Sequence, residues 1–120
     1  MSELFDELKN LGADIEDGMD RFMGNEDLYR RMLFKFTDMI EKQGVSPDFT
    51  SGENGYEDVI AQAHAIKGAT GNLALTPLYK AYTEIVNLLR DGQPEPAREV
   101  LTKALPIQTA VIRCIEKYKQ

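Results

Sequence analysis

The segment VIAQAHAIKGATGNL spans residues 59–73 and contains the only histidine of the chain. Apolar or small residues recur along it at intervals that alternate between four and three positions, which is the spacing of one face of a helix rather than of a strand. The positions on that spacing form a seam that we expect to be buried: Val59, Ala63, Ile66, Thr70 and Leu73. Successive residues turn by about 100° around a helix axis, which places His64 nearly opposite Ile66. The imidazole should therefore face water.

The other long segments show the same helical spacing, and none has the strict two-residue alternation of a strand. Capping residues mark their starts, and glycine-rich or polar stretches separate them. We expect helices at about residues 2–11, 14–23, 25–43, 55–73, 76–90 and 94–118. Thr76 should cap the fifth, with Pro77 in its first turn. This pattern predicts an all-α fold, with an antiparallel four-helix bundle in residues 25–120 and short accessory helices in residues 1–24.

Length and composition limit the class of protein. A chain of 120 residues suffices for one domain with its own core, so we expect a single domain over residues 1–120. The net charge of −6 argues against nucleic acid as a partner. No apolar run approaches the ~20 residues of a membrane span, and the first residues lack a signal region. The lone Cys114 cannot form an internal disulfide. We expect a cytoplasmic monomer that binds proteins and not membranes.

The outward face around His64 carries mainly small residues and one cation. We expect it to include Glu57, Ile60, Ala61, Lys67, Gly68, Gly71 and Leu75. Each of the two glycines weakens a helix by up to about 1 kcal/mol relative to alanine, so both need a packing or functional reason. Gly68 lies one turn beyond His64 and leaves room for an approaching group. We interpret both glycines as giving steric access to the imidazole.

A phosphoryl group is the ligand that this face suits best. An imidazole is mostly neutral at cellular pH, which leaves one ring nitrogen free as a nucleophile. Lys67, three residues beyond His64, could stabilise the negative charge of a transferring phosphate. The sequence thus predicts His64 as phosphoacceptor and Lys67 as the phosphate-stabilising residue.

Simpler interpretations exist for each of these residues. A helical histidine is most often an ordinary surface or core residue, Lys67 alone could be a solvated charge, and Gly71 could only permit close helix packing. A metal site is poorly supported, because His64 lacks companion histidine or cysteine ligands at usable spacing. Phe34 faces away from the seam of its own helix, and we weigh packing under the N-terminal helices equally with contact to a partner. In the second case Ile60, Ala61 and Phe34 would form a docking rim around His64.

The residues His64-Ala65-Ile66-Lys67-Gly68 resemble the signature of histidine phosphotransfer domains, in which histidine is followed by any residue, an aliphatic residue, lysine and glycine. The segment LGADIEDGMDRFMGNEDLYRRMLFKF, residues 11–36, is similar to that family's upstream block. The likeness covers about residues 11–90. Ala74 departs from it, because family members often carry glycine there.

The resemblance implies a phosphorelay carrier of two-component signal transduction. His64 would accept a phosphoryl group on Nε2 from the phospho-aspartate of a receiver domain and pass it to the aspartate of another receiver. The implied partners are receiver domains of hybrid sensor histidine kinases and of response regulators. The carrier needs no cofactor of its own, since the receiver holds the magnesium ion. It is not an enzyme, because the receiver supplies most of the catalytic machinery.

Two other functions compete with this one. A helical adaptor could bind receivers or other proteins without carrying phosphate, although the combination of His64, Lys67 and Gly68 argues against it. A self-sufficient enzyme finds little support, because the sequence contains no phosphate-binding glycine loop and no nucleophile elbow.

Overall fold

The computed structural model describes residues 2–119, which form six helices and no strand. The predicted all-α class is therefore confirmed for this part of the chain. The helices are α1 (Glu3–Asn10), α2 (Ile15–Arg21), α3 (Glu26–Gln43), α4 (Glu57–Asn72), α5 (Thr76–Arg90) and α6 (Pro94–Lys117).

The three helices nearest the N-terminus start at side-chain caps that the sequence predicts. The Ser2 hydroxyl accepts a hydrogen bond from the backbone N–H of Phe5. Asp14 and Asn25 cap α2 and α3 in the same way, and Gly44 is the residue after the end of α3. Such caps satisfy N–H groups that have no partner within a helix, which is why these starts could be located closely.

The start of α5 differs from the prediction by one residue. Leu75 occupies the cap position, Thr76 is already helical, and no side chain caps this helix. The reason lies in the preceding turn, where Ala74 has a φ of +56°. This left-handed conformation ends α4 and favours glycine, and Ala74 adopts it at the position where the resembling family often has glycine. It leaves Leu75 buried.

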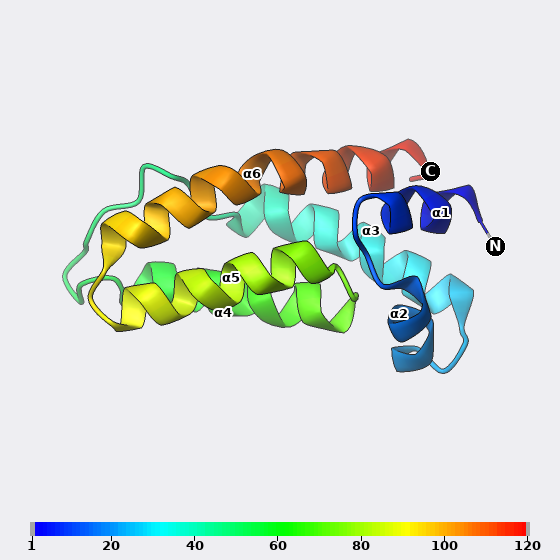
Figure 1. Cartoon of the computed structure of the whole chain (residues 1–120), viewed down its shortest axis with the longest axis horizontal. Helices are drawn as coiled ribbons and strands as arrows, with labels where there is room; N and C mark the ends of the chain where they lie inside the picture. Colours follow the sequence, from blue (N-terminus) through cyan, green and yellow to red (C-terminus); the bar gives the residue numbers. More distant parts are fainter. Residues whose placement is uncertain (1, 120) are drawn as a thin grey trace.

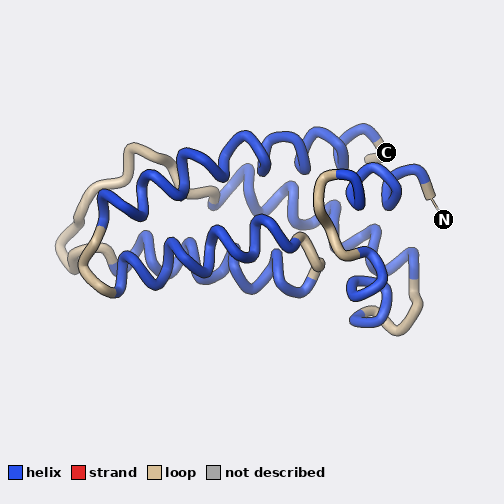
Figure 2. The backbone as a smooth tube through the Cα atoms, viewed as in Figure 1, coloured by secondary structure: helices blue, strands red, loops and turns tan. Residues whose placement is uncertain are grey.

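Helices α3 to α6 lie alongside one another, and each runs opposite to the one before it (Figure 1). Helix α5 packs against α4 and α6, and α3 contacts both of these as well. Helices α1 and α2 lie at one end of this group, with α1 beside the end of α6. The long connection between α3 and α4 lies at the opposite end (Figure 2). The molecule is elongated, with extents of 45 × 24 × 22 Å.

The core forms between these helices from the apolar face of each. All five residues of the predicted α4 seam are buried, which confirms that prediction. One polar group in the core is Gln108 on α6, which accepts a hydrogen bond from the Tyr82 hydroxyl. Burial raises the pKa of Tyr82 to about 12, so its hydroxyl remains a donor over the neutral range.

Tyr29 on α3 connects the N-terminal helices to the end of α4. Its ring stacks between Phe5 and Phe22, with centroid distances of 5.1 and 5.2 Å. Its hydroxyl donates a hydrogen bond of 2.7 Å to the carbonyl of Leu73, the residue that ends α4. The backbone N–H of Asp14 donates to the carbonyl of Ala74 over 2.9 Å. Helix α3 and the capping residue of α2 thus hold the turn that follows the histidine-bearing helix.

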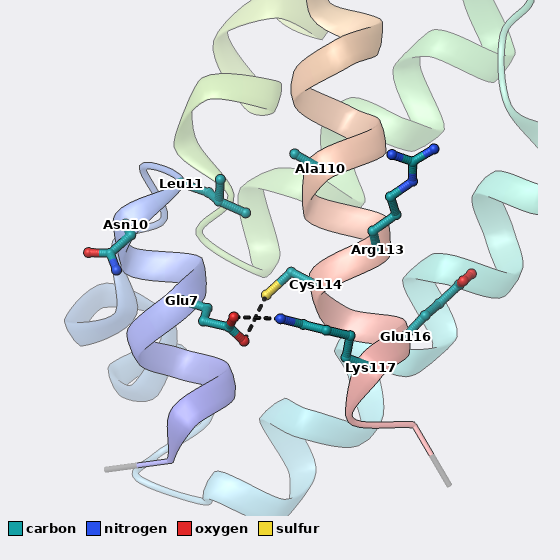
Figure 3. Close-up of a pocket in the computed structure, with 8 residues that line it drawn as sticks. All are labelled: Glu7, Asn10, Leu11, Ala110, Arg113, Cys114, Glu116 and Lys117. Atoms are coloured by element: carbon teal, nitrogen blue, oxygen red, sulfur yellow. Dashed lines mark hydrogen bonds and ion pairs between the residues drawn. The ribbon is translucent and has the colours of Figure 1, made fainter.

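The C-terminal end of α6 is fastened to α1 through one carboxylate. Glu7 accepts hydrogen bonds from the ammonium of Lys117 at 2.6 Å and from the hydroxyl of Tyr118. Figure 3 shows Glu7 on α1 facing Lys117 and Cys114 on α6. These contacts, first that from Lys117, lower the pKa of Glu7. The bond to Glu7 raises the pKa of Tyr118 to about 12.

None of the helices in residues 2–119 combines the length and the apolar character that crossing a membrane requires.

Candidate functional site

His64 lies on the exposed face of α4, as the helical projection predicts. It borders an open hollow of about 450 Å³ on the protein surface. Residues of α4 and one residue of α5 line this hollow: Glu57, Ile60, Ala61, His64, Ala65 and Arg90. The imidazole is thus accessible to a molecule that rests against α4.

The predicted docking rim is present only in part. Ile60, half-buried, and Ala61, exposed, both line the hollow beside His64. Phe34 does not line it; this side chain is partly buried on α3 and packs against the hydrophobic core. The structure therefore agrees with a packing role for Phe34 and does not bring it together with His64. Leu75 was also expected on this face, and that expectation is wrong, because Leu75 lies buried in the turn beyond α4.

Arg90 is the site residue that the sequence pattern missed. It is the last residue of α5, is exposed, and lines the hollow together with His64. The antiparallel course of α4 and α5 brings the end of α5 beside the first turns of α4. A basic residue in the last turn of a helix is common, because it interacts favourably with the helix dipole. No local signal therefore separates Arg90 from an ordinary helix end.

Lys67 is half-buried on α4 and does not line the hollow. Its backbone carbonyl accepts a hydrogen bond of 2.9 Å from the hydroxyl of Thr70, which is fully buried. None of the ion pairs between residues 2 and 119 includes Lys67 or Arg90. Neither cationic group is therefore held in an ion pair within these residues. Because Arg90 lies beside the turns before His64 and Lys67 follows it, they flank the imidazole along the helix.

The two glycines of α4 differ in their surroundings. A Cβ atom placed on Gly68 would meet nothing within 4 Å, so packing within the chain does not require a glycine there. A Cβ atom on Gly71 would come within 2.9 Å of the Tyr79 ring. Gly71 therefore has a packing reason, the simpler interpretation considered for it above. For Gly68, which is exposed, no contact within residues 2–119 explains the glycine.

A larger cavity, of about 790 Å³, lies elsewhere, between α1 and α6. Glu7 and Lys117 line it and form an ion pair with each other, and Arg113 and Glu116 also line it (Figure 3). Across residues 2–119, no group of three or more histidine, cysteine, aspartate or glutamate side chains is arranged to hold a metal ion.

The chain was compared with protein-family models, curated proteins and solved structures, and nothing matches it in any of the three.

Proposed function

We propose that this protein is a phosphorelay carrier of two-component signal transduction. His64 accepts a phosphoryl group from the phospho-aspartate of one receiver domain and passes it to the aspartate of another. We further propose that helices α3 to α6 form an antiparallel four-helix bundle that presents His64 on its surface. In this proposal the protein acts as a monomer in the cytoplasm, and its partners are receiver domains of hybrid sensor kinases and response regulators.

The single observation that supports this proposal best is the pairing of His64 with Gly68. The imidazole is exposed, and one turn further the helix carries a glycine that no contact within residues 2–119 requires. Such a glycine lowers helix stability by up to about 1 kcal/mol, and its presence supports the close approach of another surface to His64. A histidine without a receiving function would need no such space beside it.

The transfer needs only a nucleophile and charge stabilisation from this chain. The lone pair of Nε2 forms the new P–N bond while the P–O bond to the receiver aspartate breaks, and the carboxylate leaves with that electron pair. Arg90 of α5 lines the same hollow as His64, and Lys67 lies three residues beyond His64 on α4. Both side chains lower the energy of the negatively charged phosphoryl group in transit. Magnesium, which assists such transfers, is expected on the receiver, so the carrier acts without a cofactor and without being an enzyme.

Transfer from a phosphorylated receiver tests the proposal. Wild-type protein should acquire phosphate that is labile in acid and stable in base, as expected for a phosphoramidate, and His64→Gln should acquire none. Because His64 is the only histidine, the assignment is unambiguous. Equal labelling of both proteins would contradict the proposal. Binding of receivers without labelling would favour an adaptor, and labelling from ATP alone would favour a kinase.

A further inference from the structure

Glu57 is the one acidic side chain that lines the hollow at His64. It lies seven residues before His64 on α4, which corresponds to two turns and about 10 Å along the helix axis. Seven steps of about 100° also bring it to nearly the same side of the helix as His64. Glu57 is exposed, and none of the ion pairs in residues 2–119 includes it.

A free carboxylate is unexpected in a place that receives phosphate, because like charges repel. At about 10 Å through water the repulsion is weak, since this separation exceeds the screening length of about 8 Å at physiological ionic strength. Glu57 therefore neither helps the phosphoryl group nor strongly hinders it. A molecule that covers the hollow, however, displaces this water. Glu57 forms no ion pair with Arg90 of the same hollow or with any other residue in 2–119, so the covering molecule has to supply the partner for the carboxylate.

The helix N-terminus explains an acidic residue here only in part. Acidic side chains in a first turn interact favourably with the helix dipole, and α4 carries two of them, Glu57 and Asp58. Asp58 is equally exposed but does not line the hollow. Both residues share the dipole effect, whereas only Glu57 faces the space beside His64. Asp58 therefore serves as a matched control for any role in the helix itself.

We propose that Glu57 determines partner choice: the receiver that docks on the hollow places a lysine or arginine against this carboxylate. The footprint of the partner then carries two opposite charges, with its phospho-aspartate facing His64 and its basic residue facing Glu57. A receiver without a base at that place leaves Glu57 covered and unpaired, which disfavours it. This inference rests on the proposed function.

The test uses a panel of purified receiver domains phosphorylated with acetyl phosphate, from which the fastest donor to wild-type protein is selected. With that donor, Glu57→Gln should raise the half-saturating receiver concentration about 3-fold and Glu57→Lys about 10-fold, as for loss and reversal of one exposed ion pair. Asp58→Asn should change it less than 1.5-fold, by the same reasoning. In 0.5 M NaCl the difference between Glu57→Lys and wild type should shrink, because salt screens the pair.

Charge reversal on the receiver completes the test. Each exposed lysine and arginine around the phosphorylation site of the donor is changed to glutamate, and one such change should restore transfer to Glu57→Lys. Rescue supports the pairing. The inference is overturned if no charge reversal on the receiver restores transfer to Glu57→Lys, or if Glu57→Lys accepts phosphate as wild type does. It is also overturned if Asp58→Asn raises the half-saturating receiver concentration as much as Glu57→Gln does.

Failure of the proposed function itself would look different from failure of this inference. If the proposed function is wrong, no receiver of the panel labels the wild-type protein. Phosphoramidate, used as a small phosphoryl donor, then shows whether His64 is chemically reactive. That result would refute the relay and the inference together, whereas labelling of wild type without an effect at Glu57 would refute the inference alone.

Discussion

Replacing Gly68 by alanine should make the protein more stable and less active at the same time. The exposed helix position favours alanine by up to about 1 kcal/mol, and the added methyl group meets no atom within 4 Å. For a chain of 120 residues this gain corresponds to a rise in Tm of about 4 °C. The same methyl group, one turn from His64, stands in the way of a receiver that must bring its phospho-aspartate to the imidazole.

The size of the loss follows from how strictly phosphoryl transfer depends on geometry. A displacement of about 1 Å can cost on the order of 10²-fold in rate. We expect Gly68→Ala to slow transfer from a receiver by roughly 10-fold and Gly68→Gln, with its longer side chain, by about 10²-fold. Glutamine is also a good helix former, so both variants should remain at least as stable as wild type. Thermal unfolding and transfer rates on the same samples measure both quantities.

Gly71 provides the matched control on the same helix. A methyl group there meets the Tyr79 ring at 2.9 Å, which offsets the gain in helix propensity. Gly71→Ala should therefore bring no rise in Tm. The reasoning on Gly68 is refuted if Gly68→Ala and Gly68→Gln transfer phosphate at the wild-type rate, or if both lower Tm, since the glycine would then have an internal role.

Three further variants test other parts of the structure. Tyr29→Phe keeps the stacked ring but leaves the Leu73 carbonyl without its donor, so the free energy of unfolding should fall by about 1–2 kcal/mol in chemical denaturation; an unchanged value would contradict the role of this hydrogen bond. Glu7→Gln should destabilise the protein at neutral pH. The pKa of Glu7 is lowered in the folded state, so its contribution is present above the ordinary carboxyl range and lost as pH falls through the lowered pKa. Unfolding experiments from pH 7 to pH 2 should show the two proteins converging, and a constant difference would disprove the ion pair with Lys117 as its source. Arg90→Gln should slow transfer from a receiver about 10-fold or more, as loss of one charge-stabilising group does, with little change in Tm. Transfer by this variant at the wild-type rate would show that Arg90 takes no part in the reaction.

Features set by local chemistry could be predicted from the sequence. Ser2, Asp14 and Asn25 cap helices because a short polar side chain satisfies free N–H groups, whatever the rest of the chain does. The position of His64 opposite the Ile66 seam follows from helix geometry alone, and both side chains lie as expected.

Features set by contacts between distant segments could not be predicted. Arg90 reaches the site only because α5 runs back along α4, and its own neighbours in sequence indicate a plain helix end. The buried position of Leu75 follows the left-handed Ala74, a conformation that alanine rarely adopts. The frequent glycine of the resembling family at this position was the one sequence signal for it. Gly68 and Gly71 look alike in the sequence, and only the place of the Tyr79 ring separates them.

The passage of one labelled phosphate through the chain tests the central claim most directly. A receiver labelled on its aspartate is mixed with this protein and a second, unlabelled receiver, and the label on each species is followed over time. The account predicts loss from the first receiver, a transient rise on this chain, and arrival on the second receiver, with all transfer abolished in His64→Gln. Arrival of label on the second receiver with His64→Gln in place of wild type, or its failure to arrive with wild type, would contradict the claim.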